Sequence, residues 1–303
     1  MLTFFGTGRI EPTWSQCICC IGTFDGVHLG HQEVIKTARL IADNVGLPLV
    51  VITFDRHPAA TLRPDLKPPS IQGLTENLRT FESCGADVCL VLSFDENLAK
   101  TTAEDFYNDV ISKLLMATHV VIGGDFGFGA GRRGTGEWLS QHVATTVVSP
   151  FCVDGIRVSS TVVREAIRSG DIEAANRYLG RPFCISGVVV RGKQIGRTLG
   201  FPTANLALAE DLAVPADGVY AGHLKLGEKV YGAAISVGTN PTLGDNARTI
   251  EAFLLDYDGP EFYGRAVRLE FVGQIRTMES FANLESLREQ MVHDVEQIRT
   301  ILT

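Results

Sequence analysis

A glycine-rich run that carries two histidines, Gly22–His31, separates a strand candidate from a helix candidate. The apolar stretch Cys17–Ile21 predicts a buried strand before the run, and apolar residues at helical spacing predict a helix after it that ends at Gly46. A strand that passes through a glycine turn into a helix leaves backbone N–H groups and the positive end of the helix dipole facing one point. The run therefore predicts an α/β unit with an anion site, and a polyphosphate is the expected ligand.

The two histidines stand at the helix start with the spacing His-x-Gly-His. His28 comes just before the helix and His31 lies in its first turn, so both imidazoles can reach one phosphate chain. Two other interpretations stay open. One is a tight turn with capping histidines, and the other is a zinc site that adds His57, although no cysteine or carboxylate pattern completes such a site. The run lacks the lysine of a P-loop.

The first half of the chain alternates strand candidates with helix candidates. Short apolar strands between helices predict a doubly wound parallel sheet, whose ligands bind beyond the carboxyl ends of the strands. The loops at Gly22, His57 and Gly124–Gly129 should emerge at that edge. The strand candidates are Cys17–Gly22, Pro48–Phe54, Val88–Leu92, Val120–Gly123 and Thr145–Val148, and the helix candidates are Gln32–Asn44, Thr75–Ser83, Ala103–Leu115, Gly136–His142, Thr161–Ser169 and Ile172–Tyr178.

The pattern changes after Gly180–Pro182, where we place a boundary between domains 1–180 and 181–303. Alternating strands with regular turns predict an antiparallel β-barrel in the second domain. A terminal helix, Leu284–Leu302, has an apolar stripe that we expect to pack on the core. The stripe is Leu284, Leu287, Met291, Val295 and Ile298, and the strand candidates are Cys184–Arg191, Val219–Lys225, Lys229–Val237, Thr249–Leu255 and Val267–Val272.

Composition narrows the class of protein. A net charge of −8 over 303 residues argues against a nucleic-acid partner. The sequence has neither an apolar run that could span a membrane nor the basic, apolar start of a signal peptide, so we expect a cytoplasmic protein. Three of the seven cysteines, Cys17, Cys19 and Cys20, fall in the first strand. Neighbouring strand residues point to opposite faces, which favours small buried side chains over a metal site.

Further motifs follow the histidine run in a fixed order. They are Thr53–Pro58 (TFDRHP), Gly124–Gly129 (GDFGFG) with Arg132, Arg133 and Gly134 after it, Ser159–Arg164 (SSTVVR) and Gly196–Asn205 (GRTLGFPTAN). The histidine run itself resembles the HxGH signature of the nucleotidyltransferase superfamily. Together with the other motifs, its longer form GTFDGVHLGHQ resembles the prokaryotic bifunctional riboflavin kinase/FAD synthetase (FMN adenylyltransferase) family over nearly the whole chain.

The resemblance implies an enzyme of flavin-cofactor synthesis with two activities. Domain 181–303 would phosphorylate riboflavin to FMN, and domain 1–180 would adenylate FMN to FAD with release of pyrophosphate. ATP, riboflavin, FMN and FAD would be the substrates and products, and Mg²⁺ the metal. The implied partners are small molecules rather than nucleic acid or membrane, and a homo-oligomer stays open.

Adenylyl transfer needs positioned donors and charges, because the FMN phosphate itself attacks the α-phosphorus of ATP. His28 and His31 fit as donors to the ATP phosphates, and the resemblance supports this role. Arg164 would add a fixed guanidinium. The hydroxyls of Ser159, Ser160 and Thr161 could hold the triphosphate, with a plain helix cap as the alternative. The other binding residues expected here are Gly22, Phe24, Gly30 and His57.

Three residues of the Gly124–Gly129 loop are further candidates for this first site. The rings of Phe126 and Phe128 could stack on a flavin or an adenine, although we expect at least one of them to be an ordinary core residue. Asp125 could contact a ribose or help to hold magnesium, and the sequence does not decide between these roles.

Riboflavin phosphorylation needs ATP with magnesium and a base for the attacking hydroxyl. Thr203 and Asn205 offer neutral oxygens suited to Mg²⁺, and the resemblance places the metal there too; a polar strand entry after a proline is the alternative. The resemblance also implies Glu251 as the base for the ribityl 5′-hydroxyl, and Arg276 and Phe281 as part of a segment that closes over the flavin. Glycines and cations that could wrap the polyphosphate, with the adjoining proline, are Gly192, Lys193, Gly196, Arg197, Gly200 and Pro202.

One residue departs from the family pattern. Arg56 stands where the family motif TFxPHP has a proline, and we expect it to change FMN binding rather than abolish it, since a guanidinium can also meet a phosphate.

Two other function classes stay open. A nucleotidyltransferase for a nicotinate or pantetheine phosphate would leave the GRTLGFPTAN motif without a purpose. A flavin-storage or flavin-sensing protein would not need the intact His28, His31, Thr203, Asn205 and Glu251.

Overall fold

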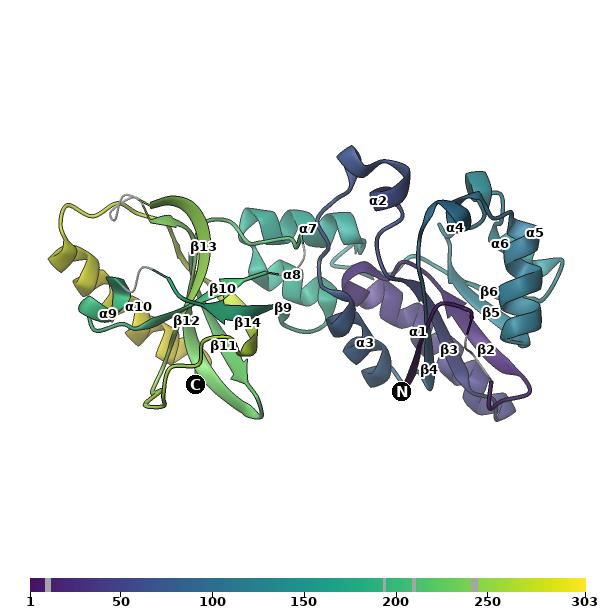
Figure 1. The fold of residues 1–303 in the computed structure, drawn as a ribbon, viewed down its shortest axis with the longest axis horizontal. Coiled ribbons are helices and arrows are strands. Elements are labelled where there is room, and N and C mark those ends of the chain that lie inside the picture. The colour runs from purple at the N-terminus through teal and green to yellow at the C-terminus, as the bar shows by residue number, and fades with distance from the viewer. Residues whose placement is uncertain (9–11, 193–194, 209–210, 241–244) are drawn as a thin grey trace. The chain divides into compact units, whose positions relative to one another are not determined.

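The computed structural model describes residues 1–8, 12–192, 195–208, 211–240 and 245–303, and its contacts divide the chain into the units Met1–Ser160 and Thr161–Thr303 (Figure 1). Helix α8 (Ile172–Leu179) is tied to the second unit by Asn176. Its Nδ2 donates to the carbonyl of Phe271 at 3.0 Å, and its Oδ1 accepts from the N–H of Phe183 at 2.6 Å. The functional boundary near residue 180 stays a prediction.

The first unit contains the predicted parallel sheet. Its six strands all run parallel in the order β1-β4-β3-β2-β5-β6. Five of them overlap the strand candidates, whereas the edge strand β1 was not predicted, because its four residues, two of them exposed apolar side chains, carry no burial pattern. The strands are β1 (Leu2–Phe5), β2 (Cys17–Ile21), β3 (Leu49–Phe54), β4 (Val88–Leu92), β5 (Ala117–Gly123) and β6 (Ala144–Val148).

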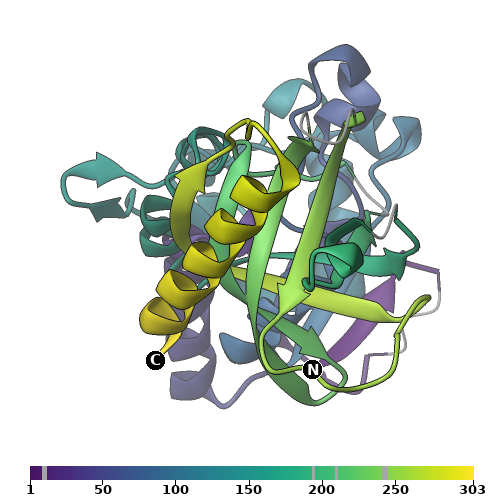
Figure 2. The ribbon, with the colours of Figure 1, turned by 90° about the vertical axis from the view of Figure 1, so that its left-hand side faces the viewer.

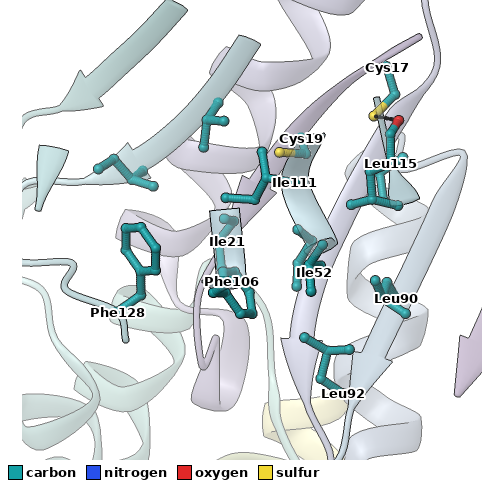
Figure 3. Close-up of a cluster of buried hydrophobic side chains, with 14 of the residues drawn as sticks. Cys17, Cys19, Ile21, Ile52, Leu90, Leu92, Phe106, Ile111, Leu115 and Phe128 are labelled. Carbon is teal, nitrogen blue, oxygen red and sulfur yellow. Dashed lines mark hydrogen bonds between the residues drawn. The ribbon is translucent and has the colours of Figure 1, made fainter. Parts of the chain in front are cut away.

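Helices cover both faces of this sheet, as the alternation along β2 shows. Cys17 and Cys19 belong to a core cluster on one face, which Figure 3 shows with Leu115 and Phe128. Cys20 belongs to a separate cluster on the other face. All three thiols are fully buried and free, and burial raises the pKa of the Cys17 thiol to about 12. The prediction that these three cysteines are small buried side chains is confirmed.

The helices of the first unit agree with the candidates in position and differ in detail. The expected single helix Ala103–Leu115 is a short α-helix that continues as a π-helix, in which the N–H of Leu115 donates to the carbonyl of Val110. Short helices after β3 and β4 were not predicted. The helical segments are η1 (Asp25–Val27), α1 (Leu29–Val45), α2 (Ala59–Leu62), η2 (Pro64–Leu66), α3 (Leu74–Ser83), α4 (Glu96–Lys100), α5 (Ala103–Phe106), η3 (Tyr107–Leu114), η4 (Ala130–Arg132) and α6 (Gly136–Ser140); a hairpin of β7 (Cys152–Val153) and β8 (Ile156–Arg157) precedes α7 (Ser160–Ser169).

The second unit contains the predicted antiparallel barrel. Its strands close in the order β10-β13-β12-β11-β14-β9, and each neighbouring pair is antiparallel. The pairing of β10 with β13 sets Asn205 opposite Glu251. The elements are β9 (Phe183–Val190), α9 (Ile195–Thr198), β10 (Thr203–Ala207), β11 (Gly218–Leu226), β12 (Lys229–Asn240), β13 (Asp245–Leu254) and β14 (Ala266–Thr277).

The terminal helix α10 (Leu284–Leu302) lies along the barrel and contacts β11, β12 and β14 (Figure 2). Its predicted apolar stripe is only partly core. Ile298 is fully buried with Val219 of β11, as expected, but Leu284 is half exposed, so the prediction is wrong at the first position of the stripe. Leu287 and Met291 line a cavity instead of a closed core.

Candidate functional site

Three predicted loops of the first unit follow adjacent strands of its sheet. The histidine loop follows β2, the loop with His57 follows β3, and the Gly124–Gly129 loop follows β5. Strands β3, β2 and β5 are neighbours and parallel, so the three loops leave the sheet at the same carboxyl edge. The topology thus brings these loops together as predicted.

The histidine pair forms the start of α1. His28 is the N-cap, and its Nδ1 accepts a hydrogen bond from the N–H of His31 at 3.3 Å. This bond places the proton of the neutral His28 ring on Nε2, which is then a donor. The two rings are stacked with centroids 3.6 Å apart and an angle of 18°. The pair thus lies at the positive end of the α1 dipole with the Nε2–H of His28 as a donor, an arrangement that suits a phosphate ligand.

The loop before His28 has an unusual backbone that hydrogen bonds hold in place. Phe24 and Val27 have φ angles of 49° and 39°, in the left-handed region that such side chains rarely adopt. The Asp25 carboxylate accepts from the N–H of Ile71 at 2.9 Å, and its carbonyl accepts from Ser160 Oγ at 3.1 Å. Strain that the surrounding structure maintains is typical of ligand-binding loops.

Small residues and an aromatic ring pack around the histidines. The buried ring of Phe24 meets His31 edge to face, with centroids 5.3 Å apart. A Cβ at Gly22 would lie 2.9 Å from the Phe24 ring, and one at Gly30 would lie 3.3 Å from the His28 ring. A side chain at Gly22 would therefore require the Phe24 ring to shift, and one at Gly30 would require the His28 ring to give way by a few tenths of an ångström.

Hydrogen bonds within the loop after β3, and from this loop to residues after β4, hold the loop in place. His57 Nδ1 accepts from the N–H of Ala59 at 3.1 Å. Asp55 accepts from Ser93 Oγ at 2.9 Å, from the N–H of Phe94 at 3.0 Å and from Arg56 Nη2 at 2.9 Å. These hydrogen bonds lower the pKa of Asp55 despite partial burial. Arg56, the departure from the family pattern, is half exposed and engaged with its neighbour.

The three candidate residues of the Gly124–Gly129 loop differ in burial: Phe128 is buried, Phe126 is partly buried and Asp125 is exposed. Phe128 is buried in the core cluster of Figure 3, and Phe126 stacks beside it with centroids 5.9 Å apart. Phe128 thus fits the expectation that one of the two is a core residue. The exposed Asp125 carboxylate pairs with Arg157 Nη2 at 2.8 Å, and its carbonyl accepts from Arg132 Nη2 at 2.7 Å. No spacing or motif in the sequence indicates the contact between Asp125 and Arg157.

The segment Ser159–Arg164 begins helix α7 as predicted. The Ser160 hydroxyl donates to the carbonyl of Asp25, as described above, and so connects this segment to the histidine loop. Thr161 and the buried Arg164 belong to the second unit, and their part in phosphate binding stays a prediction.

The second unit contains a cavity of about 620 Å³ among the described residues. One part of its wall is polar and includes Gly192, Thr203, Asn205 and Glu251. The remainder is mostly apolar and comes from the barrel strands, from the segments before β10 and after β14, and from α10. The sequence analysis missed this apolar wall, which includes Leu199, Phe201, Val219, Phe253, Met278, Leu287, Met291 and Val295.

The polar wall places Glu251 beside the predicted metal ligands. Thr203 Oγ1 donates to Glu251 Oε2 at 2.8 Å, and Thr249 Oγ1 lies 3.4 Å from Glu251 Oε1. Asn205 is the register partner of Glu251 on the neighbouring strand. A hydroxyl, an amide and a carboxylate within one wall form an oxygen donor set, which suits a hard cation bound together with phosphates.

The residues of the expected phosphate wrap precede β10 or lie at its start, and their part in phosphate binding stays a prediction. A Cβ at Gly192 would collide with the amide of Asn205, and one at Gly196 with the carbonyl of Phe201. Gly200 has φ +88°, which favours glycine, and Pro202 follows it. Arg197 forms an exposed ion pair with Glu261 at 2.7 Å and is not among the described residues that line the cavity. Lys193 lies outside the described residues.

Arg276 lines the cavity, and its partner is a residue that the sequence analysis missed. Its guanidinium pairs with Asp294 of α10, with Nη2 2.8 Å from Oδ2, and lies 5.6 Å from the centroid of Phe281. A signal existed: Asp294 is an acidic residue on the apolar face of the helix, next to Val295 and three positions after Met291. Such a residue needs a buried partner.

Two kinds of feature are absent from the described part of the chain. No group of three or more His, Cys, Asp or Glu side chains there is placed to hold a metal ion. None of the described helices has the length and apolar character needed to cross a membrane.

Comparison with known proteins gives a consistent family. A model described as FAD synthetase matches residues 10–162, and one described as riboflavin kinase matches residues 179–302. The bifunctional riboflavin kinase/FMN adenylyltransferase of Escherichia coli (strain K12) is 37% identical over 286 residues, which are 92% of this chain and 90% of that protein. The protein of the same name from Bacillus subtilis (strain 168) is 35% identical over 296 residues, 95% and 93% of the two chains.

A solved structure extends the likeness to the whole fold. It is described as a macrolide-efflux protein from Streptococcus pneumoniae, is 32% identical, covers 99% of both chains and superposes with a TM-score of 0.88. That description concerns the Streptococcus protein, whereas both family models and the curated relatives agree on flavin chemistry. The chain belongs to the bifunctional riboflavin kinase/FMN adenylyltransferase family.

Proposed function

We propose that residues 1–180 carry out FMN adenylylation at the histidine loop and that residues 181–303 carry out riboflavin phosphorylation in the barrel cavity, with Mg²⁺ at Thr203 and Asn205. The family supplies the two activities. The observation that supports the assignment of the kinase step is the contact of Thr203 with Glu251 beside a largely apolar cavity. Because both steps consume ATP, we place the enzyme in the cytoplasm.

In the adenylylation step the FMN phosphate attacks the α-phosphorus of ATP, and pyrophosphate leaves. The protein supplies donors rather than a nucleophile. His28 Nε2–H and the His31 ring stabilise the negative charge that builds up on the phosphate oxygens, and the N-terminus of α1 adds its dipole. Arg164 and the hydroxyls of Ser159, Ser160 and Thr161 hold the triphosphate in this proposal, and His57, Asp125 and Phe126 complete the site.

In the kinase step the riboflavin 5′-hydroxyl attacks the γ-phosphorus of ATP, and ADP leaves. Glu251 accepts the hydroxyl proton, and the bond from Thr203 fixes the direction of its carboxylate. Mg²⁺, when bound, would neutralise charge on the β- and γ-phosphates. Gly192, Gly196, Gly200 and Pro202, with Lys193 and Arg197, form the proposed phosphate loop. The flavin ring fits the apolar wall, which includes Phe281.

Chromatography of the products of riboflavin, ATP and magnesium tests the assignment. FMN should appear first and FAD after it, and supplied FMN should give FAD with equimolar pyrophosphate. FMN alone would show that the first unit is inactive. Turnover of a nicotinate or pantetheine phosphate in place of FMN would overturn the assigned acceptor.

Replacement of Arg56 should have a small effect on FMN use. In Arg56→Pro and Arg56→Ala we expect the KM for FMN to rise by at most about fivefold, which corresponds to roughly 1 kcal/mol for an exposed ion pair. Asp55 keeps its bonds from Ser93 and Phe94, so the loop should stay ordered. The alanine variant separates loss of the guanidinium from the backbone restraint of proline. Equal FMN constants in all three proteins would remove any special role for Arg56.

A further inference from the structure

The ion pair between Arg276 and Asp294 joins the end of β14 to α10 at the cavity wall. Arg276 Nε lies 3.0 and 3.1 Å from the two carboxylate oxygens of Asp294, and Nη2 lies 2.8 Å from Oδ2. Gln290 Nε2, one turn earlier on α10, donates to Asp294 Oδ1 at 2.8 Å. The carboxylate therefore accepts hydrogen bonds from two elements and binds the guanidinium through two of its nitrogens, Nε and Nη2.

Because the pair between Arg276 and Asp294 is buried, each charge depends on the other for stabilisation. The side chains of Arg276 and Asp294 are 14% and 5% exposed, whereas those of Arg299 and Asp256, a second pair between α10 and the barrel unit, are 48% and 74% exposed. A charge in the buried site is costly when its partner is missing, so removal of either side chain leaves the other without compensation. The exposed pair carries no such penalty.

The ion pair also contacts the segment after β14, which contributes to the apolar wall of the cavity. Arg276 Nη1 donates to the carbonyl of Thr277 at 3.1 Å, and the guanidinium carbon lies 5.6 Å from the Phe281 ring centroid. Arg276, Met278, Phe281 and Asp294 all line the cavity. Asp294 thus fixes a guanidinium that in turn supports the segment after β14, while Glu251 and Thr203 lie on strands β13 and β10.

We propose that Asp294 is a positioning residue of the kinase site: it holds Arg276, and through it Phe281, in the geometry that binds the flavin ring of riboflavin. This inference rests on the proposed assignment of the kinase step to the barrel cavity. Asp294 does not take part in the proton transfer, so its loss affects the binding of riboflavin more than the chemical step.

Asp294→Asn tests the proposal, because it preserves shape and removes the charge. We expect the KM for riboflavin to rise roughly tenfold or more with kcat within about threefold, the size typical of losing a partner that orients a binding group. Fluorescence titration of riboflavin without ATP should show the same loss of affinity. The KM for ATP and the adenylylation of supplied FMN should not change.

Asp256→Asn is the matched control. It breaks the Arg–Asp pair between α10 and the barrel unit that lies outside the cavity lining, and asparagine tolerates the left-handed backbone at this position (φ 56°). It should leave both riboflavin constants unchanged. Equal losses in Asp256→Asn and Asp294→Asn would overturn the proposal, since they would indicate a general loosening of α10.

Arg276→Lys tests the same contact from the barrel and serves if Asp294→Asn does not fold. It keeps the positive charge but loses the bidentate contact with Asp294, and it should raise the riboflavin KM about as much as Asp294→Asn does. The double variant Asp294→Asn/Arg276→Lys should raise the riboflavin KM no more than the more impaired of the two single variants, because both substitutions remove the same interaction. Additive effects, or an unchanged riboflavin KM, would reject the role of Asp294. If neither Glu251→Gln nor Asp294→Asn changes any kinetic constant of riboflavin phosphorylation, the assignment of the kinase step to the barrel cavity itself fails.

Discussion

The double variant His28→Ala/His31→Ala is expected to lose FAD formation while it still makes FMN from riboflavin. The stacked pair supplies two donors at the start of α1, and each donor aimed at the developing phosphate charge contributes about 10²- to 10³-fold in rate. We therefore expect adenylylation to fall by roughly 10³-fold or more. FMN and FAD measured by chromatography from the same incubation report both steps at once.

His119→Asn provides the control for this experiment. His119 lies in the amino-terminal half of β5, and its Nε2 forms a hydrogen bond of 2.8 Å with Thr146 Oγ1. Because strands of the sheet are parallel, this position is away from the carboxyl edge where the histidine loop emerges. The control should keep both activities. Adenylylation within tenfold of the wild type in the double variant, or loss of both steps in a folded protein, would refute the assignment.

The sequence predicted elements well where a burial pattern was complete. Strands such as Val88–Leu92 are buried along their length, and their bounds agree with prediction. Strand β1 was missed because an edge strand has one neighbour and needs little apolar pattern. The loops at the carboxyl edge could be predicted because parallel topology alone fixes where they emerge.

Side-chain partners were much harder to predict than elements. The roles of Asp125 and Arg197 in ligand binding stay predictions, but the ion pairs that these residues form were not foreseen. Asp125 pairs with Arg157, far along the chain, and Arg197 pairs with Glu261. The apolar face of α10 marks Asp294 as a residue that needs a partner, but only the packing of α10 beside β14 identifies that partner as Arg276. Such contacts depend on tertiary geometry, and no local spacing encodes them.

The variant Glu251→Gln should lose riboflavin phosphorylation while it still converts supplied FMN to FAD. A glutamine keeps the size of Glu251 and an oxygen that can accept from Thr203, but it cannot take the proton of the 5′-hydroxyl. Removal of a general base costs roughly 10²- to 10⁴-fold in kcat. Riboflavin binding should change little, because the proposed function places the flavin ring on the apolar wall of the cavity rather than on Glu251.

Glu270→Gln is the matched control, since Glu270 is a partly buried strand glutamate of the same barrel that pairs with Arg268 and is not among the described cavity residues. It should phosphorylate riboflavin normally. If Glu251→Gln kept the wild-type kcat, water or a phosphate oxygen would have to accept the proton, and the carboxylate would serve only to orient Thr203. A fall in both variants would instead point to loss of barrel stability, which thermal unfolding would detect. A fall confined to Glu251→Gln therefore distinguishes a base from a strand residue that merely supports the barrel.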